Sequence, residues 1–459
     1  MNDLTSSRLT AIIDNPDREA DLLAGIARQA LDRARAGGAE QAEVHVSSAL
    51  GREAAVRLGE IETLEEARDR QLQVTVYRAR CSASAATGDL RPETVAETVE
   101  RALAIARHTQ PDRAAGLADA HRMADGFDEL DLWHPRDIAL DELVERARAM
   151  ESAGRATDQR IENSEGAGVS IEASVAVYAN SHGFLGVSRA TSYSQSCVLV
   201  AADASGMQRD YDWDSACCFD DLASPEATGQ SAARRTLRRL GARRVSTGRS
   251  PVLFVPEVAS GLLGHLVSAV SGGNLYRRSS YLIDAAGQSI LPDWASLVEQ
   301  PRLPRAARSA NFDAEGVATQ TSPLVKHGVL ERYVLGSYSA RRLGLETTAN
   351  AGGVRNLVLF GARHDFSELL QTMGRGVVVT EVMGQGVNIV TGDYSRGAAG
   401  FRVEGGALAE PVEEITIAGN LRDMLAGLVA AGTDVDTRRN IRTGSLLVGE
   451  MTVAGQEDG

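Results

Sequence analysis

An apolar, helix-patterned stretch with one histidine is the first place in this sequence where chemistry could occur. It reads GLLGHLVSAVSGGNLYRRSSYLID over residues 261–284, and the histidine is His265. A zinc-peptidase helix needs a glutamate beside its first histidine, to activate water, and a second histidine on the same face. Here Leu266 follows directly, and Ala269 and Val270 come four and five positions on. The pattern predicts a packed or hydrogen-bonded histidine, and a metal held by His265 with distant residues is the alternative.

No other set of residues matches a familiar catalytic or nucleotide-binding motif. The remaining histidines are scattered, and the pair His364 and Glu368 is more typical of a solvated ion pair than of a metal site. The glycine-rich stretch GQGVNIVTGDYSRG fits neither nucleotide-binding spacing. Its glycines more simply permit close approach of the backbone in a β-structure.

A basic, serine-rich segment follows the histidine helix, which the periodicity places over 257–271. If 276–284 forms a short strand, its polar side chains would offer donors on both faces. Guanidinium and hydroxyl groups can bind carboxylates and peptide carbonyls. Pairing with some of the 62 acidic residues of the chain is the alternative. The candidate residues of this segment are Arg277, Arg278, Ser279 and Ser280.

A second basic run, RRTLRRLGARRVSTGR at 234–249, could suggest nucleic acid. At this spacing on a helix, arginines more often form ion pairs or a solvated face. The chain carries a formal charge of −14, with 48 basic and 62 acidic residues, and an acidic surface repels phosphate backbones. We therefore expect no nucleic-acid partner.

The elements that position these residues differ between the two halves of the chain. In the first half, helical spacing and period-two alternation occur in separate runs rather than as a regular βαβ order, which indicates an α+β fold. The segment 168–203 predicts an antiparallel meander with a turn at NSHG. The helices are expected over 19–36, 92–107, 139–152 and 224–240, with strands at AEVHV and LQVTVY.

Beyond residue 245 the chain consists mostly of glycine-punctuated strands, the first of them at PVLFVP. We predict an N-terminal α+β domain with an antiparallel or mixed sheet over 1–245, and a β-rich C-terminal domain over 246–459 that carries the histidine helix. Three helices are expected in the second domain, near 257–271, 365–373 and 420–431.

Composition indicates a cytoplasmic protein. The chain has four cysteines in 459 residues and none in a C-x-x-C pair, which fits a reducing compartment. The N-terminus shows no basic region followed by an apolar one, so no signal peptide is expected. No apolar run approaches the roughly 18–20 residues that cross a bilayer, so no membrane association is expected.

The stretch 261–284 resembles the signature of the PmbA branch, also called TldE, of the TldD/PmbA family. Similar segments run over nearly the whole chain, and MGQGVNIVTGDYSRGAAGFRVEGG at 383–406 is the most specific of them. The others are ARAGGAEQAEV, TQPDRAAGLAD at 109–119, YANSHGFLG at 178–186, GVLERYVLGSYSARRLGLETTANAGG at 328–353 and LLVGEMTVAG at 446–455.

The resemblance implies how such a chain works. TldD-type members carry His-Glu-x-x-x-His on the corresponding helix and bind zinc, whereas PmbA-type members lack the motif and pair with a TldD-type subunit. The heterodimer is a metallopeptidase for unfolded or extended peptides, such as a microcin leader or an antitoxin. If His265 aligns with the first histidine, Leu266 replaces the glutamate and Val270 the second histidine.

We therefore expect the non-metal-binding subunit of such a peptidase, with no catalytic residue and no cofactor of its own, and with zinc in the TldD-type partner. Arg277, Arg278 and Arg396 are the expected contacts to peptide or partner, and self-association into a homodimer is expected when the partner is missing. Two other functions stay open. One is an autonomous metallopeptidase that uses His265, and the other is a regulatory binding protein linked to DNA gyrase.

Overall fold

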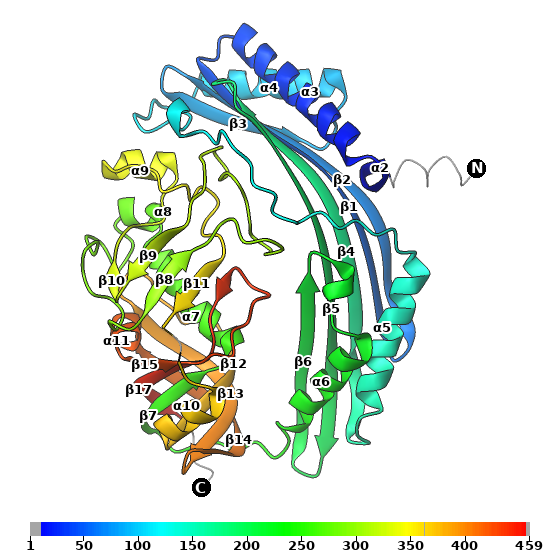
Figure 1. Cartoon of the computed structure of the whole chain (residues 1–459), viewed down its shortest axis with the longest axis vertical. Helices are drawn as coiled ribbons and strands as arrows, with labels where there is room; N and C mark the ends of the chain where they lie inside the picture. Colours follow the sequence, from blue (N-terminus) through cyan, green and yellow to red (C-terminus); the bar gives the residue numbers. More distant parts are fainter. Residues whose placement is uncertain (1–10, 362, 456–459) are drawn as a thin grey trace.

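The computed structural model describes residues 11–361 and 363–455. Its N-terminal part is one large, curved sheet with helices on one face, and its C-terminal part is a β-rich body that lies against the opposite side (Figure 1). The predicted α+β class is confirmed. Residues 241–247 connect the two parts, and the domain boundary at residue 245 stays a prediction.

The first sheet is antiparallel throughout, in the order β3-β2-β1-β4-β5-β6. Its central strands are unusually long, which lets one sheet run the whole height of the molecule (Figure 1). The strands are β1 Gln41–Arg57, β2 Glu60–Arg78, β3 Cys81–Thr87, β4 Ile161–Asn180, β5 Leu185–Asp203 and β6 Gly206–Ala216.

Strict alternation along these strands decides which face the helices cover. On β1, Val44 and Val46 are buried in a core with α3 and α4, whereas His45 and Ser47 point to the other face. A second core under α5 and α6 continues along the same face. The helices are α2 Ala11–Asp14, α3 Pro16–Ala36, α4 Pro92–Ala106, α5 Leu140–Arg155 and α6 Pro225–Leu237, with short 3-10 turns η1 Ala120–Arg122 and η2 Phe219–Asp221.

The C-terminal part contains two further sheets, in the orders β10-β9-β8-β11-β16 and β14-β13-β12-β7-β17-β15. In the second of these, β14 also pairs with β17, so that part of the sheet closes on itself. The strands are β7 Gly248–Phe254, β8 Ser296–Glu299, β9 Ser322–Lys326, β10 Val329–Leu330, β11 Leu357–Phe360, β12 Gly376–Met383, β13 Asp393–Glu404, β14 Ala407–Asn420, β15 Leu428–Ala431, β16 Ile441–Arg442 and β17 Leu446–Ala454.

The histidine helix is central to this part, because its apolar face contributes to the core that both sheets share. Two short helices, α8 and α9, were not expected from the sequence. The helices are α7 Pro256–Ala269, α8 Gly272–Tyr276, α9 Ser337–Leu343, α10 Phe366–Met373 and α11 Leu421–Ala426.

The helix predicted over 420–431 is correct only in its first half. It ends at Ala426, and after Gly427 the chain forms β15, which pairs with β17. The apolar run 424–431 has no periodicity that distinguishes helix from strand, so the tertiary pairing decides. Among the described residues, no helix is long and apolar enough to cross a membrane.

Close packing of α5 against α6 generates a stability prediction. A Cβ added at Gly229 would lie 1.9 Å from the backbone oxygen of Met150, so the helices would have to separate. We expect Gly229→Ala to lower the free energy of unfolding by about 1–3 kcal/mol. The matched control is Gly25→Ala, because Gly25 lies within α3 with nothing within 4 Å of its added Cβ. Its stability should stay the same or rise by up to about 1 kcal/mol. Equal denaturant midpoints for the two variants would contradict the close approach.

Candidate functional site

Helix α7 presents one of its faces to a cavity. The helix starts with Pro256 at its first turn, where the missing N–H costs no hydrogen bond. Most of its apolar residues are buried, whereas Glu257, Gly261 and His265, four positions apart, line a cavity of about 290 Å³. The other walls of the cavity come from β6 and α6 of the first part and from β12 and β13 of the second, so the cavity lies between the two parts, at what we call the seam. His265 is half-buried there.

The surroundings of His265 favour an uncharged ring. Its ring packs edge-on against Tyr394 with 6.1 Å between the ring centroids. Burial lowers the pKa of His265, and the nearby positive charge of Arg396 lowers it further. Burial also raises the pKa of Tyr394 to about 12, so its hydroxyl stays protonated. The Nε of Arg396 donates to the carbonyl of Met383 at 3.5 Å.

The carboxylates around the cavity are engaged by arginines. Glu257 lies 2.8 Å from Arg235, and Glu381 lies 2.6 Å from Arg239. Asp210 lies between the same two arginines, at 3.8 and 3.7 Å. We call these five residues the seam network. It joins β6 and α6 of the first part to α7 and β12 of the second.

Zinc does not fit the residues at this helix. No group of three or more His, Cys, Asp or Glu side chains suited to a metal occurs within the described ranges 11–361 and 363–455. A bound divalent ion needs ligands with free lone pairs, and an adjacent guanidinium repels it. The expected alignment of the motif with Leu266 and Val270 stays a prediction. Leu266 and Val270 are fully buried in the core, on the side of α7 away from the cavity.

The segment after α7 is not the strand predicted over 276–284. It forms the short helix α8 and then turns, with Arg278 in the left-handed region at φ 57°. The backbone N–H of Ser279 bonds to the carbonyl of Asn274, which folds the segment back on itself. The pair of glycines at 272–273 and the asparagine favour a turn here, and this signal outweighs the β-propensity of the following residues.

The predicted contact residues of this segment differ in accessibility. Arg277 and Arg278 are exposed, and the guanidinium of Arg277 lies over the ring of Tyr276. The hydroxyl of Ser280 is buried and donates to the carbonyl of Ala269 at 2.6 Å, which satisfies the end of α7. Of the five predicted contact residues, Arg396 is the one that lines the His265 cavity. The role of all five stays a prediction.

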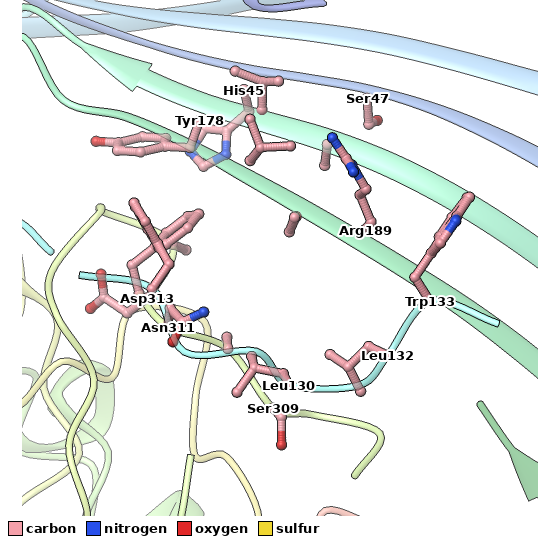
Figure 2. Close-up of a pocket in the computed structure, with 18 of the residues that line it drawn as sticks. His45, Ser47, Leu130, Leu132, Trp133, Tyr178, Arg189, Ser309, Asn311 and Asp313 are labelled. Carbon is pink, nitrogen blue, oxygen red and sulfur yellow. The ribbon is translucent and has the colours of Figure 1, made fainter. Parts of the chain in front are cut away.

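A larger cavity, of about 1160 Å³, lies where the first sheet faces the C-terminal part (Figure 2). His45 and Tyr178 line it from the sheet, and Asn311 and Asp313 line it from a C-terminal loop. The third wall is the extended segment 127–133, which we call the strap. This cavity could not be predicted from the sequence, because AEVHV and YANSHGFLG indicate only a strand and a turn, and the strap has no periodicity.

Buried ionisable groups surround one end of this cavity. Glu43 accepts hydrogen bonds from the hydroxyls of Tyr77 at 2.8 Å and Tyr178 at 2.9 Å, and burial raises the pKa of Glu43. Burial and the charge of Glu315 raise the pKa of Asp313 to about 6. Burial lowers the pKa of His45. These groups lie where the sheet meets the C-terminal loop, and burial disfavours the charged form of each.

Comparison with known proteins identifies the family. Three models of PmbA/TldA metallopeptidase domains match the chain: domain 1 at 42–106, the central domain at 133–240 and the C-terminal domain at 247–455. The metalloprotease PmbA of Escherichia coli O157:H7 is 45% identical over 97% of this chain and 99% of its own length.

Solved structures agree with this similarity. A candidate modulator of DNA gyrase from Bacteroides thetaiotaomicron is 28% identical, with a TM-score of 0.89 over 94% of this chain and 99% of its own. TldE from Thermococcus kodakarensis has the same fold, with a TM-score of 0.82 at 20% identity over 94% of this chain and all of its own. The chain therefore belongs to the PmbA/TldD metallopeptidase family, as a PmbA-type member.

Proposed function

We propose that this chain is the metal-free subunit of a heterodimeric metallopeptidase, and that a TldD-type partner supplies the zinc. The observation that carries the proposal is the arginine content of the His265 cavity. The cavity is lined by Arg235, Arg396 and Arg439 and by Asp210, Glu257 and Glu381, and these carboxylates are paired with arginines. Because the described residues give Arg396 no carboxylate partner, its guanidinium suits peptide carbonyls and carboxylates rather than a divalent cation. The chain's part in hydrolysis would then be to hold the substrate.

The substrate class follows from the same chemistry. An extended peptide offers backbone carbonyls and, at its end, a carboxylate, and both are acceptors for guanidinium groups. We infer that Arg396 is a contact to such a peptide, because its guanidinium lies beside the half-buried His265 and its acidic neighbours at the seam already have arginine partners. Unfolded peptides of the microcin-leader or antitoxin type fit this description.

The same proposal includes where the chain acts and with what. We infer a cytoplasmic location, because Cys81, Cys197, Cys217 and Cys218 are all free thiols. A homodimer is the proposed state when the partner is missing, since related subunits that pair can also pair with themselves. Neither nucleic acid nor a membrane is proposed as a partner.

The first test combines this chain with a TldD-type subunit. We expect peptide cleavage by the mixture and none by this chain alone, which should hold far less than one equivalent of zinc. His265→Ala in this chain should change the rate of the mixture by less than about tenfold, because loss of a general acid or base costs about 100-fold or more.

Two results would overturn the proposal. Cleavage by this chain alone, with one tightly bound zinc lost in His265→Ala, would show an autonomous metallopeptidase. Co-purification with gyrase but with no TldD-type subunit would show a regulatory binding protein. The control is a TldD-type subunit in which the histidines or the glutamate of the His-Glu-x-x-x-His motif are replaced. If the zinc of the partner performs the chemistry, the mixture with this subunit should not cleave the peptide.

A second test measures the titration of His265 by NMR. We expect its pKa to lie below 6.5, to rise in Arg396→Ala, and to stay unchanged in Arg402→Ala, a control on the same strand whose partners are Glu404 and Glu410. A ring that bound a metal would not titrate in this way.

The same shift has a consequence for stability. Because the folded pKa of His265 lies below the unfolded value of about 6.5, the unfolded chain takes up the proton first as pH falls. The wild-type chain should therefore lose stability relative to His265→Gln between pH 7.5 and 5.5. Denaturant midpoints at the two pH values check the sign, and a constant difference would contradict it.

A further inference from the structure

The larger cavity lies beside an unpaired strand edge. On one side β5 pairs with β4 along its whole length, but on the other side β6 pairs with β5 only from Tyr193 onward. Residues 185–190 of β5 therefore have no strand next to them on that side. Leu185, Val187 and Arg189 line the cavity along this stretch.

The direction of the unpaired backbone groups follows from one hydrogen bond. The N–H of Thr191 donates to the carbonyl of Leu132 on the strap at 2.9 Å, so it points away from β4. In an antiparallel ladder the backbone groups of every second residue point the same way. The N–H and C=O groups of Leu185, Val187 and Arg189 therefore point toward the cavity, and no described residue outside the sheet bonds to them.

The strap lies close to β5 at both ends of this stretch but not between them. At one end, Phe127 packs against Phe184 with 6.4 Å between the ring centroids. At the other end is the bond between Thr191 and Leu132. In between, hydrogen bonds hold the strap to the C-terminal part: the N–H of Arg305 donates to the carbonyl of Leu130 at 2.9 Å. Figure 2 shows the strap with Leu130 and Leu132 on one side of the cavity and Arg189 on the other.

We propose that this slot between β5 and the strap binds a single extended peptide, which adds to the sheet as a strand. The inference rests on the proposed function, because it names where the chain grips its peptide. The backbone groups of an extended segment are the natural complement of an open edge. About six residues would span 185–190 at roughly 3.3 Å per residue.

The strap decides between a peptide and a folded partner. Because it closes the outer side of the slot, the edge of a second sheet cannot reach β5, whereas a single chain can. The lining also suits a peptide with alternating side chains. Trp133 on the strap and the 37% exposed Val187 offer apolar contacts. Ser188, which follows Val187 and therefore lies on the opposite face of β5, is polar. The guanidinium of Arg189 pairs with Asp17 of α3 at 2.5 Å, so Arg189 contributes its backbone rather than its charge to the slot.

The experiment measures binding of a fluorescein-labelled, acetylated hexapeptide of alternating valine and threonine to the isolated chain, by fluorescence anisotropy. Val187→Pro removes one of the N–H groups that face the slot and no bond to β4. We expect Val187→Pro to weaken binding of the hexapeptide at least about tenfold, because hydrogen bonds between β5 and the peptide are lost. Val187→Ala keeps the N–H and should weaken binding less than about threefold.

A second measurement keeps the test valid if Val187→Pro does not fold. Two forms of the hexapeptide, N-methylated at one or the other set of alternate amides, are compared on the wild-type chain. At least one form should lose about tenfold or more in affinity, because methylation blocks the backbone donors without changing the side chains.

Several results would overturn the site. These are no binding of the hexapeptide at 1 mM, equal binding by the two Val187 variants, or equal binding of both methylated forms and the parent. Binding that occurs only after residues 1–10 are removed would assign the slot to the chain's own N-terminal segment. The assay uses neither the partner nor cleavage, so its failure leaves the heterodimer proposal standing, and failure of the heterodimer leaves the slot standing.

Discussion

The seam network is the interaction on which the candidate site depends. Arg235 on α6 binds Glu257 of the second part, and Arg239 in the turn after α6 binds Glu381. These side chains are largely shielded from water, and Glu257 and Arg235 have further partners in Arg438 and Asp212. Arg239 is the one partner that the described residues give Glu381, so removing Arg239 would cost about 1–3 kcal/mol. The network thereby fixes how β6 and α6 lie against α7, and with it the shape of the His265 cavity. It also occupies the carboxylates that a metal would need.

The long first sheet imposes a second constraint, because its unpaired edge strands have to be covered. An open edge invites pairing with other chains, and proteins normally cover it. Here β6 covers one half of the outer side of β5, and the strap touches the other half only at its ends. Hydrogen bonds to the C-terminal part keep the middle of the strap away from β5. The gap between the strap and β5 is therefore a consequence of the tertiary structure and not of an irregularity in the strand. An edge covered in this way leaves room for one extended peptide but not for the edge of a second sheet.

Local patterns in the sequence predicted the elements better than the sites. The helices over 92–107 and 365–373 were recognisable because Pro92 and the capping residues of α10 mark their starts. The prediction of a strand at 276–284 was wrong, because the turn favoured by the glycines at 272–273 and by Asn274 outweighed the β-propensity of the following residues. His265 was found from its helix, and Arg396 from the family resemblance, yet only the structure brings the two together. The slot could not be predicted, because its walls come from residues near 130, 187 and 311, and each is ordinary by itself.

The electrostatic character of the His265 cavity has a consequence for the proposed metal-free role of this chain. A zinc site surrounds the cation with negative and neutral ligands, and the zinc ion binds the lone pairs of a substrate oxygen directly. In this cavity the carboxylates are paired with Arg235 and Arg239, and Arg396 supplies the remaining positive charge, which together with burial lowers the pKa of His265. Peptide carbonyls and carboxylates are attracted in both cases. What differs is water: a guanidinium holds an acceptor in place but does not lower the pKa of a bound water molecule as zinc does. Under the proposed function, a subunit of this kind would bind the same peptide chemistry as a catalytic partner, and hydrolysis would come from that partner.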